Sequence, residues 1–259
     1  MSVLGPGQAG FPQRLCALDW KRPLYVRGTL TEDRAIAIVG ARAASGKAMD
    51  RAHVLARHLA NAGVRVISGG ALGIDGAAHR GSSGATTVVL GSGIDVAYPA
   101  RHAQLFEMVV AHGGALVSMF PMGMQPRRST FLQRNPLIAA LADAVIVVEA
   151  DVQSGSLSTA RAAREQGRVV AACPGSRGCE RLLATGAALV QNVDDAFALL
   201  RGTPRYPVPP VLDEIATQVR DAIAAGANGI DAIVERTGLP VRSVLRALPQ
   251  LESCSARMQ

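Results

Sequence analysis

The stretch "SGGALGIDGAAHRG", residues 68–81, holds five glycines and follows directly on the β-branched run "VRVIS" (64–68). Glycine loses more conformational freedom on folding than any other residue, so such a cluster needs a structural reason. One reason is a tight turn from a buried strand into a helix. Another is a ligand that approaches bare backbone, since N–H groups converging at a helix N-terminus bind anions. The residues expected to face such an anion are Ser68, Gly69, Gly70 and Gly73.

Short apolar strands alternate with helical segments along most of the chain. The predicted strands span 35–40, 64–68, 86–93, 115–120, 144–150 and 168–175. The predicted helices between them include 48–63, 100–114, 134–143, 156–167 and 193–202. This alternation predicts an α/β fold, an extended Rossmann-like parallel sheet with helices on both faces. Ligands of such sheets bind at the carboxyl ends of the strands, where glycine, serine and arginine recur in this chain.

The chain divides into four predicted parts. Residues 1–34 are an irregular lead-in that ends in a short edge strand, and residues 35–202 form the Rossmann-like domain. The Pro-rich segment "TPRYPVPP" (203–210) is a linker. Residues 211–259 predict three short helices, and Gly238 supplies the turn of a helix-turn-helix. We expect this last part to be a small winged-helix-like module.

Basic side chains outnumber acidic ones, which gives a formal net charge of +7. Five arginines and six carboxylates lie in 211–259, so the positive balance lies entirely in the first 210 residues. Only two of the 27 basic residues are lysines. The arginine bias reflects either coding preference or phosphate recognition by planar guanidinium groups. A polyanionic partner is therefore expected on the N-terminal part.

The cysteines and the apolar segments exclude several classes of protein. The four cysteines show no paired CxxC spacing, so we expect neither a disulfide framework nor a metal site. The first thirty residues hold no apolar signal core, and the longest apolar stretch, residues 136–150, is interrupted by Asp143. The expected protein is soluble and cytoplasmic, with no membrane partner.

The segment "VGARAASGKA" (39–48) resembles a P-loop but fails in two places. Five residues separate Gly40 from Gly46, and Ala48 stands where a P-loop needs a hydroxyl for magnesium. The segment does not fit the dinucleotide fingerprint either, so we expect no nucleotide cofactor. What remains is the backbone at Gly40 and the guanidinium of Arg42, both near a helix N-terminus.

The stretch "PMGMQPRRSTFLQRNP" (121–136) interleaves basic side chains with an aromatic ring. Arg127, Arg128 and Arg134 surround Phe131. Such a pattern suits single-stranded nucleic acid, whose bases stack on rings while its phosphates meet arginines. A solvated loop with a buried phenylalanine fits the composition equally well, so both interpretations stay open.

The residues suited to catalysis have simpler explanations. Asp75 is better explained as a helix N-terminal cap, and His79, one turn later, as its hydrogen-bond partner. The hydroxyls of "SGSLSTA" (154–160) lack an adjacent base, because no histidine follows residue 112. Glu149 is a lone carboxylate at a strand end. We therefore expect a protein that is not an enzyme.

Six segments in the same order resemble the DNA-processing protein A (DprA, also called Smf) family. They are "IAIVGAR", "SGGALGIDGAAHRG", "LGSGIDVAYPARH", "FLQRNPLIAALADAVIVVEA", "SGSLSTARAAREQGR" and "CPGSRGCERLLATGAALV". The resemblance extends over residues 11–202, and the tail looks like the winged-helix appendage of that family.

The resemblance implies a Rossmann-like domain that forms a homodimer and binds single-stranded DNA without sequence preference. Members of this family protect incoming DNA during natural transformation (competence) and load the RecA recombinase on it for homologous recombination. By motif match, the implied pocket residues are Arg42, Ser68, Gly69, Gly70, Phe131, Arg134, Asn135, Ser154, Gly155 and Ser156, with Arg127 and Arg128 in looser alignment.

The chain departs from the family pattern at several positions. Met119, Pro136 and Glu180 stand where the family has glutamate, arginine and asparagine. A lost arginine and a gained carboxylate would both weaken an anion site. Gly70 stands where alanine is common, and we expect the family's N-terminal helical domain to be absent.

A second class of function is a nucleotide-processing hydrolase related to the "Lonely guy" proteins, which share the fold superclass. Their Pro-Gly-Gly-x-Gly-Thr-x-x-Glu motif has a poor counterpart in residues 148–165, which lack the glycine run. A sensor of a small nucleotide also stays open, because glycine-rich pockets bind any phosphate. The function we expect is a non-catalytic single-stranded DNA binder that acts in recombination.

Overall fold

The computed structural model describes residues 1–207 and 214–255 in two compact units. The first unit comprises Met1–Leu183 and Ala187–Arg205, and the second comprises Ala184–Gly186 with the segment that begins at Tyr206. The predicted linker and C-terminal module extend into residues 208–213 and 256–259, which lie outside the described residues.

The first unit is built on a twisted sheet whose strands follow the order β1-β2-β6-β5-β4-β3-β7-β8-β9 in the described part of the chain. From β6 to β9 all neighbours are parallel, whereas β1 and β2 pair antiparallel with each other and β2 with β6. The strands are Ser2–Leu4, Leu24–Gly28, Ala35–Val39, Arg65–Ser68, Thr86–Val89, Ala115–Ser118, Ala144–Val147, Val169–Ala172 and Ala188–Leu189. The predicted Rossmann-like fold is confirmed, and the lead-in makes the sheet mixed rather than wholly parallel.

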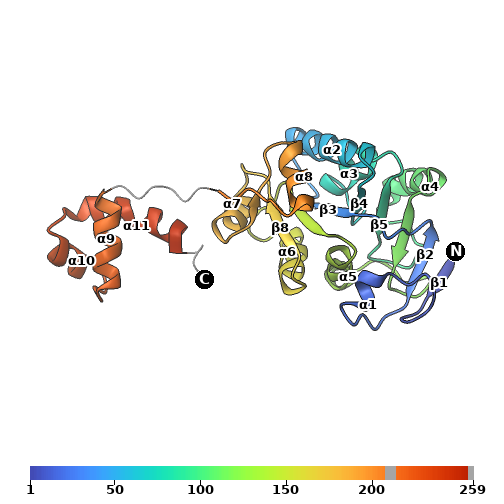
Figure 1. Cartoon of the computed structure of the whole chain (residues 1–259), viewed down its shortest axis with the longest axis horizontal. Coiled ribbons are helices and arrows are strands. Elements are labelled where there is room, and N and C mark those ends of the chain that lie inside the picture. Colours follow the sequence, from blue (N-terminus) through green and yellow to red (C-terminus); the bar gives the residue numbers. More distant parts are fainter. Residues whose placement is uncertain (208–213, 256–259) are drawn as a thin grey trace. The chain divides into compact units, whose positions relative to one another are not determined.

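Helices cover both faces of this sheet (Figure 1). The helices on one face are α2 (Gly46–Asn61), α3 (Ile74–Gly81), α4 (Ala103–Ala111) and α8 (Val193–Arg201). On the other face lie α1 (Gln13–Cys16), α5 (Arg128–Ala140), α6 (Ser156–Glu165) and α7 (Arg177–Ala184). A short 3₁₀ turn, Ala100–His102, precedes α4.

Strand β3 shows why the chain needs both layers. Its side chains alternate between the faces, so Ala37 and Val39 join one apolar cluster while Ile36 and Ile38 join the other. All of its residues are buried, and both clusters consist mainly of aliphatic side chains. A central strand of this kind is stable only when helices cover both of its sides.

The glycines of residues 68–81 allow protein atoms to approach one another closely. Gly70 has φ +72°, and a Cβ there would lie 2.8 Å from the Val88 side chain. A Cβ at Gly76 would lie 2.5 Å from the His102 ring, and one at Gly81 would collide with the His53 carbonyl oxygen of α2. The glycine cluster therefore serves a tight turn and close helix packing, the first of the two reasons considered above.

The start of α3 differs from the prediction. Gly73, with φ +74°, occupies the N-cap position, so Asp75 lies inside the first turn and is not the cap. Its Oδ2 accepts the Ala71 N–H at 3.2 Å. His79 does not bond Asp75, because its Nδ1 lies 2.8 Å from the Thr86 hydroxyl of β5.

The second unit is a small three-helix body. Its helices are α9 (Glu214–Ala224), α10 (Ile230–Thr237) and α11 (Val241–Ser255). Val219, Ile233 and Val244 meet in its core. Gly238 adopts φ +70° after α10, as expected of the turn in a helix-turn-helix. Among the described residues of the chain, no helix is long and apolar enough to cross a membrane.

We expect Gly81→Ala to lower the free energy of unfolding by about 1–3 kcal/mol, because the added methyl overpacks the contact between α3 and α2. Gly46→Ala is the matched control, since no atom lies within 4 Å of the position that its methyl would occupy and its change should be neutral or slightly stabilising. Urea denaturation of both variants measures the difference. Equal stability of the two variants would contradict the close-packing explanation.

Candidate nucleic-acid interface

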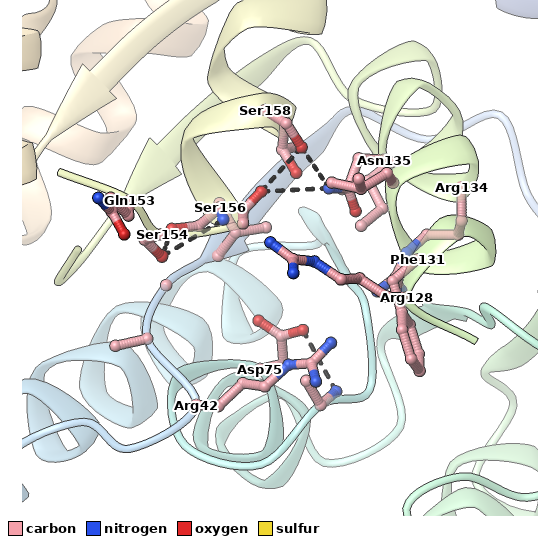
Figure 2. A pocket seen from close by; sticks show the side chains of 18 of the residues that line it. Arg42, Asp75, Arg128, Phe131, Arg134, Asn135, Gln153, Ser154, Ser156 and Ser158 are labelled. Carbon is pink, nitrogen blue, oxygen red and sulfur yellow. Dashed lines mark hydrogen bonds between the residues drawn. The ribbon is translucent and has the colours of Figure 1, made fainter. Parts of the chain in front are cut away.

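A cavity of about 860 Å³ opens at the carboxyl edge of the parallel strands (Figure 2). Its walls come from the turn after β3 (39–42), from the start of α5 (126–138) and from the turn into α6 (151–159). Ala71, Asp75 and Tyr98 complete the lining. The cavity thus lies where ligands of open α/β sheets bind.

Ten of the fourteen predicted site residues line this cavity. They are Gly40, Arg42, Arg127, Arg128, Phe131, Arg134, Asn135, Ser154, Gly155 and Ser156. The other four, Ser68, Gly69, Gly70 and Gly73, do not line it. Ser68 is fully buried, and its hydroxyl donates to the Ile38 carbonyl at 2.6 Å. These four residues therefore lie behind the lining, and Ala71 is the residue of the loop after β4 that reaches the cavity.

Arg134 is a buried arginine, with 4% of its surface exposed. Its Nη1 donates to the Gly69 carbonyl at 2.6 Å and also to the Val89 carbonyl. Burial lowers the pKa of Arg134 to about 10, while the nearby Asp75 carboxylate opposes that shift. Its guanidinium ties α5 to the ends of β4 and β5 and leaves little surface for a ligand.

Phe131 lies on α5, not in a loop, and its ring is half-buried in the cavity wall. The Arg42 guanidinium carbon lies 4.6 Å from its ring centroid, and the Tyr98 ring centroid lies 5.5 Å away. The ring also packs against the backbone of Gly91, where a Cβ would come within 2.5 Å of it. Phe131 therefore belongs to a cluster of planar groups that borders the open space.

The exposed arginines supply the positive charge of the cavity. Arg42, Arg127 and Arg128 are all exposed. In the described part of the chain, the side chains of Arg42 and Arg128 have no hydrogen-bond or ion-pair partner, so they are available to an anion. Each guanidinium presents planar donors that match phosphate oxygens.

The turn before α6 supplies neutral polar groups on the side of the cavity opposite Arg42 (Figure 2). Ser154 and Ser156 hydroxyls lie 2.8 Å apart. The Asn135 amide donates to the Ser158 hydroxyl at 2.6 Å and to the Gly155 carbonyl at 3.2 Å. Asn135, which is largely buried, therefore fixes this turn to α5.

Several residues that line the cavity were not predicted from the sequence. Tyr98, Gln153 and Ser158 line the cavity, although they belong to or directly precede segments that carried the family resemblance. Asp75 lines it too, although it was expected to cap a helix. A carboxylate is not expected in a site that binds anions, so no sequence pattern indicated that Asp75 lines the cavity.

The three departures from the family pattern lie away from the cavity lining. Met119 is buried in the core. Pro136 lies within α5, and its carbonyl accepts the Gln166 amide at 3.0 Å. Glu180 accepts the Gly175 N–H at 2.8 Å. Their positions give no direct contact with a ligand in the cavity.

Comparisons with known proteins agree with one another. The family described as DNA recombination-mediator protein A matches residues 2–201, and the DprA winged helix domain matches residues 203–252. A DNA processing protein DprA of Mycobacterium tuberculosis is 44% identical over 237 residues, which cover 85% of this chain and 61% of that relative. The chain thus spans less than two thirds of that relative's length.

Two solved structures resemble this one. DNA processing protein A from Helicobacter pylori, whose structure was reported for its single-stranded DNA binding mode, has a TM-score of 0.70 at 29% identity. The match covers 76% of this chain and 96% of that one. DprA from Streptococcus pneumoniae also has a TM-score of 0.70, at 33% identity, over 76% of this chain and 73% of its own.

We expect Arg134→Met to lower the free energy of unfolding by about 3 kcal/mol or more, because it leaves two carbonyls unpaired and the Asp75 carboxylate without its buried counter-charge. Arg128→Ala, on the exposed side of the same helix, should change it by less than about 0.5 kcal/mol. Urea denaturation separates the two. A stable Arg134→Met protein would show that this guanidinium has no structural role.

Proposed function

Because the chain belongs to the DNA recombination-mediator protein A family, we propose that it is a non-catalytic protein that binds single-stranded DNA in the cavity at the carboxyl edge of its sheet. The observation that carries the proposal is the stack of Arg42 on Phe131 beside the exposed guanidinium of Arg128. A planar stacking surface next to free phosphate donors suits unpaired nucleotides. Duplex DNA cannot offer its bases to such a stack.

The size of the cavity supports this proposal. About 860 Å³ lies in the usual range for small-molecule sites, so roughly one or two nucleotides fit inside. A base would join the cluster of Arg42, Phe131 and Tyr98, while its phosphates meet Arg127 and Arg128. The rest of the strand would run over the basic surface outside.

We extend the proposal to the cellular role that the family resemblance implies. In the cytoplasm, the protein would act as a homodimer that protects incoming single-stranded DNA during natural transformation and loads RecA on it. The family description as a recombination mediator supports this role. The single-stranded DNA binding described for the Helicobacter pylori protein supports the nucleic-acid partner.

The arrangement of the cavity gives less support to a nucleotide hydrolase. Glu149, the carboxylate at the end of β7, accepts from both the Ser45 N–H at 3.0 Å and the Ser45 hydroxyl at 2.6 Å. It therefore anchors the start of α2 and is not free to act as a base. Among the described lining residues, no histidine stands near Ser154 or Ser156.

The direct test is fluorescence anisotropy of the protein with a labelled oligo-dT over a series of salt concentrations, with unlabelled duplex as competitor. We expect binding that weakens as salt rises and that duplex does not displace. Absence of binding at low salt, or displacement by an equal amount of duplex, would contradict the proposal.

In the same assay we expect Phe131→Leu to weaken binding about tenfold, because stacking contributes ~1–3 kcal/mol per base and leucine keeps the apolar volume without the ring.

Arg42→Ala should weaken binding and reduce the salt slope by about 0.7. Arg57→Ala, an exposed arginine on α2 outside the cavity, is the control for the loss of one charge. Equal effects of Arg42→Ala and Arg57→Ala would argue against binding in the cavity.

A further inference from the structure

A second cavity, of about 180 Å³, lies between the end of α3 and α4 in the first unit (Figure 1). Its walls come from the end of α3 (79–80), from the turn that follows (83–84) and from α4 with the residue after it (105–112). None of these residues lines the larger cavity beside Phe131. The second cavity is therefore separate from the proposed DNA site.

His79 is the buried polar side chain in this wall, with 1% of its surface exposed. Its Nδ1 lies 2.8 Å from the Thr86 hydroxyl, and that hydroxyl donates to the Val66 carbonyl at 2.7 Å. Because a hydroxyl has a single hydrogen, Nδ1 must carry the ring proton and donate it to the Thr86 oxygen. The hydrogen-bond network thus assigns a lone pair to the other ring nitrogen, Nε2.

This lone pair is not used within the described part of the chain. The Nε2 atom of His79 is buried, and no described group forms a hydrogen bond with it. Burial lowers the pKa of His79 to about 3, so the ring stays neutral and Nε2 remains an acceptor at neutral pH. A buried acceptor without a donor costs free energy, so a ligand that brings a donor gains affinity there.

The size of the cavity limits what can occupy it. An apolar cavity of about 150 Å³ is known to hold one benzene ring. The space beside His79 therefore admits one six-membered ring, whereas sites for free small molecules usually measure ~300–1,000 Å³. A site of this size fits a single side chain of another protein better than a free metabolite.

The other walls favour an aromatic occupant. Leu105 and Val109 are buried, and Met108, which is 56% exposed, offers a thioether that packs well against aromatic rings. The positive charge of Arg80 disfavours a metal cation, and the described residues contain no cluster of three or more metal-binding side chains. What fits is one ring that carries one hydrogen-bond donor.

We propose that this cavity is an anchor site for a tyrosine side chain of a partner protein, whose phenol hydroxyl donates to Nε2 of His79. Tyrosine combines one six-membered ring with an O–H group, whereas phenylalanine lacks the donor and tryptophan has a larger, two-ring side chain. Tyrosines that fill pockets are among the residues that dominate the binding energy of protein interfaces. The inference does not depend on DNA binding in the larger cavity.

The first experiment titrates the unmodified protein with 4-methylphenol, which is the tyrosine side chain as a free molecule, and with toluene, which lacks the hydroxyl. The nitrogen-15 resonance of His79 Nε2 reports the hydrogen bond. We expect 4-methylphenol to bind about fivefold tighter than toluene and to shift this resonance. Equal affinity without a shift would overturn the role of His79, and binding of neither compound would overturn the site.

His79→Phe should remove the preference for 4-methylphenol over toluene, because the ring remains and the lone pair is lost. His58→Phe, at an exposed position of α2 outside both cavities, is the matched control and should keep the preference. A preference that survives in His79→Phe would contradict the assignment of Nε2. If His79→Phe fails to fold, the titration of the unmodified protein still decides the question.

A second titration tests the source of the ring. It uses the blocked tripeptides Gly-Tyr-Gly and Gly-Phe-Gly, which carry backbone on both sides of the side chain. We expect the tyrosine peptide to shift the His79 Nε2 resonance and the phenylalanine peptide to leave it unchanged. Binding of 4-methylphenol without binding of the tyrosine peptide would show that the cavity takes a free phenol, which would overturn the assignment to a partner protein.

Discussion

The buried guanidinium of Arg134 is the interaction on which the cavity depends. It donates to the carbonyls of Gly69 and Val89 at the ends of two neighbouring strands, from α5, whose first turns form part of the cavity wall. Because a buried charge is costly without partners, this arrangement requires both carbonyls and the nearby Asp75 carboxylate. Phe131, one turn earlier on the same helix, is thereby held at the cavity wall.

The same interaction explains why two distant motifs occur together. A Cβ at Gly69 would collide with the Arg134 guanidinium, so the glycine leaves the space that the arginine fills. The glycine-rich turn and the "FLQRN" segment are therefore one structural unit. The backbone that was expected to meet an anion instead meets a side chain of the protein. The groups left for a ligand are those that face the open space, above all Arg42 and Arg128.

The sequence predicts the alternating layers well, because buried parallel strands require continuous β-branched or aliphatic runs and each run is present. The short strand expected at the end of the lead-in is β2, but the sequence does not reveal β1 or the antiparallel pairing, since a three-residue strand at a sheet edge carries little periodicity. Nor does the sequence show which arginine is buried. Arg128 and Arg134 carry the same guanidinium group, so chemistry does not distinguish them. Their positions on α5, which begins at Arg128, leave Arg128 facing solvent and direct Arg134 toward the strand ends. The prediction that Asp75 caps α3 was wrong because Gly73 occupies the N-cap position.

Photocrosslinking shows whether single-stranded DNA occupies the cavity beside Phe131. The protein would be irradiated with an oligo-dT that contains 5-iodouracil, digested and sequenced by mass spectrometry. We expect crosslinks to the peptides that hold Phe131 or Tyr98, because the aromatic rings against which a base packs lie closest to it. Crosslinks confined to the three-helix unit, or spread over the surface without these peptides, would contradict binding in the cavity.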